Sequence, residues 1–407
     1  MFGLLGRKLR HSYSPEIHGA LGGYDYRLFE VEPDDLAGFI QRRDFTGLNV
    51  TIPYKRDVIP FCDELSPGAQ AIGSVNTILR RPDGSLYGEN TDAAGFERMT
   101  QVSGIDVRGR KVLVLGSGGS SLSVRYVLRQ LGAGSVSVIS RADKDDNYNN
   151  LGRHADAQVI VNTTPIGMYP DTEAAPLDLA GFPKLEGVLD IVYNPETTRL
   201  LLQARQLGIP CLGGLTMLVG QARSACELFL GKAVGKDKEL ATLRGLRRKM
   251  CNIAIVGMPG SGKTTVGQLL ARLLGKKFAD SDAALVQSAG MSIPDIFAKE
   301  GEQGFRVRET AALRGLGKES GWVIACGGGV VTRPENYFLL RQNGVIVQLE
   351  RDLNLLARDG RPLSAGNLEE MYRVRLPLYK HFADFAVTND TSAEGAAQKI
   401  IYAMNNL

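Results

Sequence analysis

The stretch NIAIVGMPGSGKTT, residues 252–265, constrains the fold more than any other part of this sequence. Residues 253–256 form an apolar run typical of a short buried strand, and the residues after them fill the pattern G-x-x-x-x-G-K-[ST]. Apolar residues then recur at helical spacing, at Val266, Leu269, Leu270 and Leu273. A strand, a glycine-rich loop and a helix in this order predict a P-loop nucleotide site in an α/β domain.

The composition of this loop fits phosphate chemistry. Its glycines allow backbone N–H groups to face the phosphates, and the dipole of the following helix favours anions. Lys263 can reach the terminal phosphates, and the Thr264 hydroxyl can bind Mg²⁺. The alternative is a merely structural turn. The predicted nucleotide-binding residues are Gly257, Gly260, Ser261, Gly262, Lys263, Thr264 and Thr265.

The chain has 407 residues, which is too long for one hydrophobic core and predicts two or three domains. Its net charge of +4 is mild and indicates no nucleic-acid partner. The five cysteines form no CxxC pair and the four histidines have no zinc spacing, so we expect a reducing cytoplasmic location. No apolar run approaches membrane-spanning length, and basic residues near the start interrupt any signal-peptide core. We therefore expect neither export nor membrane insertion.

Four short motifs follow one another near the start: S-x-S-P at 12–15, N-V-T-I-P-Y-K at 49–55, V-N-T at 75–77 and N-T-D-A-A-G at 90–95. Lys55 and Asp92 are an amine and a carboxylate, and a carbonyl reduction needs such groups because the forming alkoxide must take a proton from a positioned donor. Each residue also has a structural alternative. Ser14 and Asp92 could cap helices, and Lys55 could be a solvated lysine.

In this order the motifs resemble those of shikimate dehydrogenase, and the resemblance covers residues 1 to about 245. It implies that Lys55 acts at the reacting oxygen. It also implies a set of side chains that bind the hydroxyls and carboxylate of shikimate: Ser12, Ser14, Thr51, Asn76, Asp92, Tyr193 and Gln221. For the last two the alternative is packing, and Gln221 is expected on a helix that folds back onto the substrate domain. Ile191 and Gly214 are implied to flank the nicotinamide.

Residues 111–132, KVLVLGSGGSSLSVRYVLRQLG, have the strand, turn and helix of a dinucleotide-binding βαβ unit. The turn residues predicted to bind the cofactor are Gly116, Ser117, Gly118, Gly119 and Ser120. The third glycine position holds Ser121, a form that this family uses. At the end of the next strand, where an NAD enzyme carries a carboxylate, Arg141 predicts NADP, with an ordinary surface arginine as the alternative. Only a polar run, 142–157, leads to the following strand, so a helix and a strand usual in the family are expected to be missing.

Residues 251–407 resemble shikimate kinase. The resemblance implies that Asp280 supports the Mg²⁺ shell beside Thr264, and that Asp282 contacts the substrate and orients or deprotonates the attacking hydroxyl; either Asp could instead cap the next helix. Arg361, in a glycine-bearing segment at 358–367, is expected on a lid that closes over the phosphates and excludes water. Residues 387–391 offer no arginine for adenine stacking. The residues implied to hold shikimate are Arg306, Gly328 and Arg375.

We predict an α/β fold, in which a shikimate dehydrogenase-like unit, made of a substrate domain and a Rossmann NADP domain, is fused to a P-loop NTPase-fold kinase. The predicted boundaries are 1–93 for the substrate domain, completed by helices of 211–245, then 94–210 for the NADP domain, 246–250 for a linker and 251–407 for the kinase. The predicted cofactors are NADP(H), ATP and Mg²⁺. The predicted partners are small-molecule substrates, with no nucleic acid and no membrane, and a homodimer is one alternative for the oligomeric state.

The predicted function is NADPH-dependent reduction of 3-dehydroshikimate to shikimate, followed by ATP-dependent phosphorylation to shikimate 3-phosphate, in aromatic amino-acid biosynthesis. One alternative is a quinate-preferring dehydrogenase fused to a P-loop kinase for another small molecule. A second is a nucleotide-regulated binding protein with inactive sites. That alternative predicts the loss of catalytic residues, and all of them are present: Lys55, Asp92, Lys263, Asp280 and Arg361.

Overall fold

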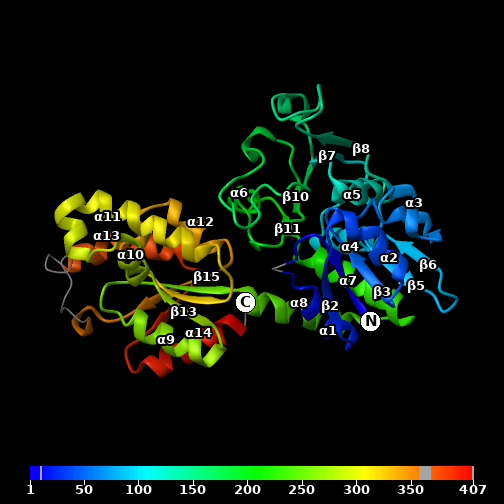
Figure 1. The fold of residues 1–407 in the computed structure, drawn as a ribbon. Coiled ribbons are helices and arrows are strands. Elements are labelled where there is room, and N and C mark those ends of the chain that lie inside the picture. The colour runs from blue at the N-terminus through cyan, green and yellow to red at the C-terminus, as the bar shows by residue number, and fades with distance from the viewer. Residues whose placement is uncertain (10–11, 357–367, 406–407) are drawn as a thin grey trace. The chain divides into compact units, whose positions relative to one another are not determined.

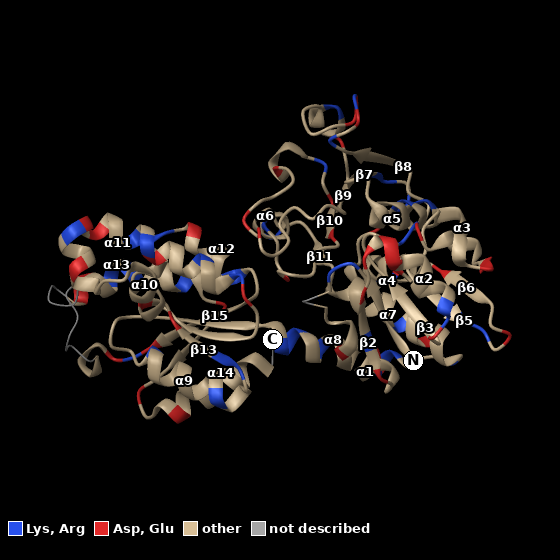
Figure 2. Ribbon diagram, viewed as in Figure 1, with Lys and Arg blue, Asp and Glu red and all other residues tan. Residues whose placement is uncertain are grey.

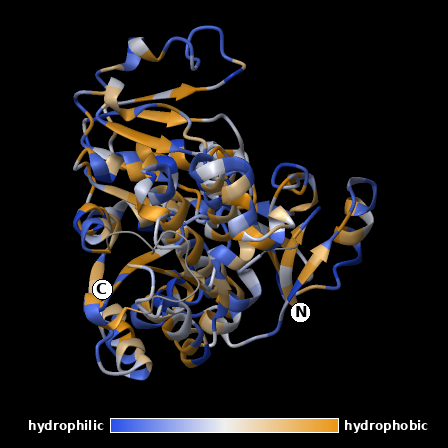
Figure 3. Cartoon of the chain, turned by 90° about the vertical axis from the view of Figure 1, so that its left-hand side faces the viewer, coloured by the Kyte–Doolittle hydropathy of each residue, from blue (hydrophilic) through white to orange (hydrophobic). Residues whose placement is uncertain are grey.

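The computed structural model describes residues 1–9, 12–356 and 368–405. The chain divides into two compact units, Met1–Gly245 and Leu246–Leu407 (Figure 1). In the described residues the first unit contains two β-sheets and the second contains one. Figure 3 shows strands that are largely hydrophobic and helices on which hydrophobic and hydrophilic residues alternate, the pattern of sheets buried beneath amphipathic helices.

The first sheet of unit 1 has the strand order β2-β1-β3-β5-β6-β4 within the described residues. These strands are β1 (Phe2–Gly6), β2 (Tyr26–Glu30), β3 (Gly47–Val50), β4 (Glu64–Leu65), β5 (Thr77–Arg80) and β6 (Leu86–Glu89). The helices between and after them are α1 (Ser14–Gly22), α2 (Leu36–Arg42), α3 (Pro67–Ile72) and α4 (Thr91–Ser103). Since β1 and β3 are parallel neighbours, the motifs that follow them, 12–15 and 49–55, emerge at the same edge of the sheet.

The second sheet of unit 1 is parallel, with the order β11-β10-β9-β7-β8 among the described strands. Its strands are β7 (Lys111–Leu115), β8 (Ser135–Ile139), β9 (Val159–Asn162), β10 (Gly187–Asp190) and β11 (Cys211–Gly213). The helices of this part are α5 (Gly119–Gln130), α6 (Arg199–Gln206), α7 (Leu215–Leu230) and α8 (Lys236–Met250). Between β8 and β9 the chain forms only a short 3-10 helix, Leu151–His154, so β8 is the edge of this sheet, as the short polar run indicates.

Helix α7 connects the two parts of unit 1, because it packs along α4 and against α1. Its residues Ala225 and Phe229 belong to a buried cluster with Leu4 and Tyr26 of the first sheet. A buried carboxylate ties the next helix to this layer: Glu239 of α8 accepts hydrogen bonds from Arg98 of α4 at 2.9 Å and from Arg223 of α7 at 2.8 Å.

Unit 2 is built on a parallel sheet with the order β13-β14-β12-β15-β16 in its described part. Its strands are β12 (Asn252–Val256), β13 (Lys277–Asp280), β14 (Trp322–Ala325), β15 (Gly344–Glu350) and β16 (Phe385–Thr388). Its helices are α9 (Lys263–Leu274), α10 (Ser281–Ala289), α11 (Ile293–Gly317), α12 (Glu335–Arg341), α13 (Leu368–Phe382) and α14 (Ala393–Asn405). In Figure 2 the charged residues of this unit gather on helices such as α11, while the strands are largely uncharged.

The residues predicted as a linker, 246–250, are the end of helix α8, because Leu243, Leu246 and Met250 are buried at helical spacing. The alternative that Ser14 caps a helix does not hold, because Tyr13 occupies the cap position before α1, and the Tyr13 side chain makes no capping hydrogen bond. The predicted lid, 358–367 with Arg361, lies outside the described residues.

Candidate active sites

The first cavity, of about 510 Å³, lies within unit 1 and brings together residues that are far apart in the sequence. It collects ten of the residues predicted to contact substrate or cofactor in this unit: Ser12, Ser14, Thr51, Lys55, Asn76, Asp92, Ser120, Ile191, Tyr193 and Gln221. Gly214 lines it as well. The cavity therefore joins the loops after β1 and β3, the start of α4 and the ends of the second sheet.

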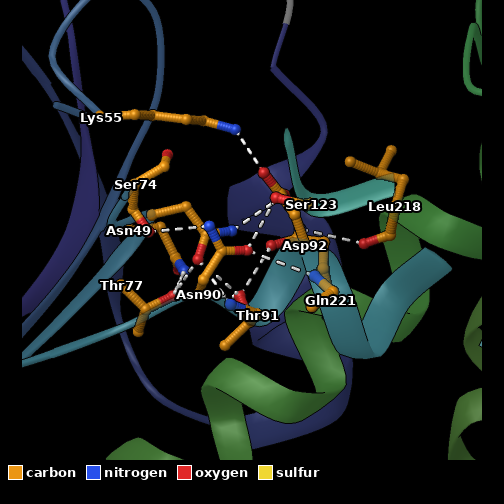
Figure 4. A network of polar contacts seen from close by, with 12 residues as sticks. Asn49, Lys55, Ser74, Thr77, Asn90, Thr91, Asp92, Ser123, Leu218 and Gln221 are labelled. Atoms are coloured by element: carbon orange, nitrogen blue, oxygen red, sulfur yellow. Dashed lines mark hydrogen bonds and ion pairs between the residues drawn. The ribbon is translucent and has the colours of Figure 1, made fainter. Parts of the chain in front are cut away.

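Lys55 and Asp92 form an ion pair in this cavity, with 2.5 Å between Lys55 Nζ and Asp92 Oδ2 (Figure 4). Asp92 stands in the first turn of α4, where the helix dipole favours a carboxylate. It is not the cap, because the Asn90 side chain accepts the hydrogen bond from the Ala93 N–H. The two side chains are 16% and 11% exposed, so the pair is largely shielded from water but open to a ligand in the cavity.

A buried network fixes the orientation of Asp92 (Figure 4). Asn76 Nδ2 donates to Asp92 Oδ1 at 2.9 Å, and Asn76 Oδ1 accepts from the backbone N–H of Thr91 at 2.7 Å. The network continues through Thr77 to Asn49, whose Nδ2 donates to Thr77 Oγ1 at 2.9 Å. Both carboxylate oxygens of Asp92 are thus held, one by Lys55 and one by this network. The sequence predictions included Asn76 but missed the parts played by Asn49, Thr77 and Thr91.

The remaining polar groups surround this pair. Ser12 Oγ accepts from the Ser14 N–H at 3.2 Å, so both hydroxyls stand at the start of α1. Gln221 of α7 lies 3.5 Å from Thr91 Oγ1 and donates to the Leu218 carbonyl at 3.0 Å. Burial raises the pKa of Tyr193, which keeps its hydroxyl protonated and able to donate. These side chains offer hydroxyl, amide and ammonium groups to a polar, anionic ligand.

The glycine turn of the second sheet fits a dinucleotide. Gly116 has φ of 98°, which favours glycine, and a Cβ on Gly118 or Gly119 would meet no atom within 4 Å. This open backbone leads into the N-terminus of α5, where N–H groups and the helix dipole favour phosphate. A Cβ on Gly214 would lie 2.0 Å from the Ile191 carbonyl, so only glycine permits this close backbone approach beside the cavity. Ser117 belongs to the same turn, and Arg141 is exposed just after the edge strand β8.

Asp190, at the end of β10, is fully buried without a cationic partner in the hydrogen bonds that hold it. Burial raises its pKa to about 6, although hydrogen bonds from Thr198, Val192 N–H and Asn162 act in the opposite direction. The pKa of Asp190 is higher in the folded state than in the unfolded state. The contribution of Asp190 to stability is therefore fully present below about pH 4, and it is lost as the pH rises to about 6 and the buried carboxyl group ionises.

We therefore expect Asp190→Asn to increase the stability of unit 1 by up to about 3 kcal/mol at pH 7, with much less effect near pH 4. An asparagine can keep the contacts with Asn162, Thr198 and the Val192 N–H. Urea unfolding of the whole chain at several pH values, followed by circular dichroism, measures the change. The single tryptophan, Trp322, lies in unit 2, so its fluorescence transition is a control that should not move. A variant that is less stable at pH 7 would contradict this prediction.

The second cavity, of about 670 Å³, lies within unit 2 at the ends of its parallel strands. It is lined by most of the described residues predicted for nucleotide, metal and substrate in this unit: Gly260, Gly262, Lys263, Thr264, Thr265, Asp280, Asp282, Arg306, Gly328 and Arg375. Gly257 and Ser261 belong to the same loop, and the Ser261 side chain is buried beneath it.

The P-loop has the backbone that phosphate binding requires. Gly257, Gly260 and Gly262 have φ of 150°, 85° and 95°, which favour glycine, and Gly262 directly precedes α9. Lys263 is buried, and its Nζ donates to the carbonyls of Gly257 at 3.0 Å and Met258 at 2.9 Å. The lysine side chain thus lies against the backbone of the loop, and the N–H groups at the start of α9 are nearby. This arrangement fits a nucleotide polyphosphate.

Asp280, the last residue of β13, makes two kinds of contact in the structure. Asp280 caps α10 by accepting from the N–H groups of Asp282 and Ala283, and its Oδ2 accepts from Thr264 Oγ1 at 2.8 Å. A hydroxyl and a carboxylate therefore lie together beside the P-loop, as a phosphate-bound Mg²⁺ requires. Within the described part of the chain no group of at least three His, Cys, Asp or Glu could hold a metal ion, and Mg²⁺ bound here would take its other ligands from phosphate oxygens and water.

The opposite wall of this cavity carries the predicted anion-binding residues. Arg306 is buried and donates to Glu309 at 2.8 Å, and a Cβ on Gly329 would lie 2.0 Å from Arg306 Nη1. Arg375 and Tyr379 both donate to the Gly328 carbonyl, at 3.2 and 2.5 Å. Burial raises the pKa of Glu309, although Arg306 acts in the opposite direction. Glu309 and Tyr379 were not predicted as site residues, yet Glu309 lines the cavity and both hold its walls in place.

Comparisons with known proteins match both units. The family model "Shikimate kinase" matches residues 259–405, and the model "Shikimate dehydrogenase substrate binding domain" matches residues 4–78. A "Shikimate dehydrogenase (NADP(+))" of Clostridium perfringens is 39% identical over 259 residues, which are 59% of this chain and 95% of the relative. No helix in the described part of the chain is long and apolar enough to cross a membrane.

Two solved structures resemble this chain. Shikimate 5-dehydrogenase from Thermus thermophilus, in complex with NADP(H) and shikimate, is 33% identical with a TM-score of 0.55, and the match covers 60% of this chain and 98% of that one. Quinate dehydrogenase from Corynebacterium glutamicum, in complex with NAD, is 30% identical with a TM-score of 0.54, and the match covers 60% of this chain and 98% of that one. The chain belongs to the shikimate dehydrogenase family, and a shikimate kinase domain follows its dehydrogenase part. It is a bifunctional shikimate-pathway enzyme.

Proposed function

We propose that unit 1 reduces 3-dehydroshikimate to shikimate with NADPH, and that unit 2 phosphorylates shikimate with Mg-ATP. The observation that carries the first activity is the Lys55–Asp92 pair, 2.5 Å apart, in a cavity also lined by Ile191 and Gly214. The observation that supports the second is the meeting of Lys263, Thr264 and the anion-binding arginines in one cavity. We also propose the domain boundaries 1–93, 94–210 and 251–407, with helices of 211–245 completing the first.

In the proposed reduction, NADPH supplies the hydride when it is bound. Lys55 Nζ donates a proton to the carbonyl oxygen of the substrate as negative charge develops there, and Asp92 holds the ammonium group in place. Asn76 keeps Asp92 from rotating by binding its other oxygen. The hydroxyls and carboxylate of the substrate are bound by the remaining polar groups, Ser12, Ser14, Thr51, Tyr193 and Gln221.

In the proposed phosphorylation, ATP supplies the phosphoryl group, and the P-loop from Gly257 to Thr265 binds its phosphates. Thr264, supported by Asp280, would hold the Mg²⁺ that accompanies ATP and offsets the charge of its phosphates. Asp282 orients the attacking hydroxyl or accepts its proton, while Arg306, Arg375 and the backbone at Gly328 bind the substrate. Arg361 remains our proposal for a cation that closes over the phosphates, and it lies outside the described residues.

The direct test uses the purified whole chain with 3-dehydroshikimate, NADPH and Mg-ATP, each omitted in turn, followed by identification of the products. We expect shikimate when ATP is omitted and shikimate 3-phosphate when all three are present. A parallel reaction with 3-dehydroquinate tests the quinate alternative, which predicts faster turnover of that substrate. Binding of nucleotides without any turnover would instead support a regulatory protein with inactive sites.

We propose that Arg141 selects NADPH by binding its 2′-phosphate, since a guanidinium can bind a phosphate with two hydrogen bonds. We expect Arg141→Ala to lower kcat/KM for NADPH at least about tenfold, a loss of about 1.4 kcal/mol or more, with little change for NADH. The ratio of the two specificity constants is the measurement. Arg129→Ala, which changes an exposed arginine in the last turn of α5, is the matched control. An equal loss for both cofactors would reduce Arg141 to a structural residue.

A further inference from the structure

Arg351 lies in the second cavity but has no part in the functions proposed above. It directly follows β15, and its side chain is partly buried. Its Nε is buried and has no hydrogen-bond partner among the described residues. A buried donor without a partner costs free energy, and in a native protein it calls for a ligand or another explanation.

The other cations of this cavity have protein partners. Arg306 pairs with Glu309 at 2.8 Å and with Glu302 at 3.2 Å, Lys263 donates to P-loop carbonyls, and Arg375 donates to the Gly328 carbonyl. Arg351, by contrast, forms no ion pair with any described acidic residue. Among the cations that line the described part of this cavity, Arg351 is therefore the one without a protein acceptor. A bound anion would neutralise its charge.

The topology places this charge beside the P-loop. Strand β15 is the parallel neighbour of β12, with Gln348 opposite Val256, the last residue before the loop. A Cβ on Gly257 would lie 2.4 Å from the Leu349 carbonyl, so the backbones are in close contact there. Because both strands end at the same edge, Arg351 leaves the sheet next to the residues that face the phosphates.

We propose that Arg351 is a further nucleotide-binding residue, whose guanidinium binds the polyphosphate of ATP in unit 2. A guanidinium suits this role because it remains charged and can donate two hydrogen bonds to one phosphate. The proposal rests on the kinase activity proposed for this unit, and it adds a cation on the β15 side of the P-loop. Arg306 and Arg375, on another wall, are left for the carboxylate of the second substrate.

The test compares Arg351→Gln and Arg351→Lys with the unchanged chain in a shikimate phosphorylation assay. We expect Arg351→Gln to raise KM for Mg-ATP about tenfold or more and to change KM for shikimate less than about twofold. Arg351→Lys keeps the charge without the planar fork, so we expect it to recover part of the affinity. Arg373→Gln removes an exposed arginine of α13 outside the cavity and is the matched control.

Two further measurements separate this proposal from other causes. Titration of each protein with Mg-ADP in a calorimeter, without shikimate, should show the weakest affinity for Arg351→Gln, an intermediate affinity for Arg351→Lys and an unchanged affinity for Arg373→Gln, in keeping with direct nucleotide binding. NADPH oxidation by the same samples should be unchanged and reports the amount of intact protein. An unchanged KM for Mg-ATP, or a change in KM for shikimate alone, would overturn the proposal. Absence of kinase activity in the unchanged chain would contradict the proposed function instead, and the Mg-ADP titration would still decide the role of Arg351.

Discussion

Replacing Lys55 with alanine should lower the rate of NADPH oxidation with 3-dehydroshikimate by about 10²–10⁴ and leave shikimate phosphorylation unchanged. Lys55 is the proton donor beside the reacting oxygen in our proposal, and Asp92 holds it at 2.5 Å. Asp92→Asn should also lower the rate strongly, because an amide cannot hold the ammonium group by charge. Steady-state assays of both activities on the same preparation measure the effect.

The matched control for this prediction is Lys111→Ala, which breaks another lysine–aspartate pair in unit 1, between Lys111 Nζ and Asp156 at 2.5 Å. Lys111 does not line the cavity, so the control should retain full dehydrogenase activity. If Lys55→Ala kept more than about a tenth of the activity, the proton donor would have to be another group. If it abolished both activities in a folded protein, the assignment of one activity to each unit would be wrong.

Replacing Lys263 with alanine should have the reverse effect and lower phosphorylation by about 10²–10³ while NADPH oxidation is unchanged. Lys263 is buried at the start of α9 and follows the inner edge of the P-loop, where it can neutralise charge on the transferring phosphoryl group. The experiment is a phosphorylation assay at saturating Mg-ATP and shikimate, combined with a thermal unfolding curve.

Lys399→Ala is a suitable control, because Lys399 also donates to a carbonyl and a hydroxyl, those of Thr388, but is exposed on α14. It should leave both activities intact. A Lys263→Ala chain that phosphorylates shikimate at a normal rate would mean that the phosphates are neutralised by other cations, of which Arg351 would be the first to examine.

The features that the sequence predicts well are those set by a few consecutive residues. The strand β12, the loop and helix α9 follow directly from residues 252–265, and the helix ends at Gly275 with φ of 62°, as a glycine after the last apolar residue indicates. The place of Arg141 just after β8 is predicted for the same reason, because a strand and the turn that ends it depend on neighbouring residues. The resemblance then supplied the residues of both cavities.

Features that depend on packing between distant residues were missed. Asn49 and Thr77 sit in motifs that were recognised, but their hydrogen bonds depend on the register of β3 and β5, where Asn49 faces Thr77. Arg351 was missed because a single arginine after a strand gives no signal until the strand order is known. For Ser14 and Asp92, residue type and position alone also allow a helix cap, but the structure has Tyr13 and Asn90 at those positions, and both Ser14 and Asp92 line the cavity.

Helix α8 limits how the two enzymes can be separated into independent proteins. Unit 1 uses its first half, because Glu239 binds Arg98 and Arg223 there. Unit 2 uses its last residues, because Lys276 donates to the carbonyls of Arg248 and Lys249, and the Gly321 N–H donates to that of Met250. A cut between residues 240 and 247 would keep both sets of hydrogen bonds, but it would break the backbone hydrogen bonds that continue α8 across the cut. Two separate proteins that each carried the whole of α8, one at its end and the other at its start, would keep these contacts together with the complete helix.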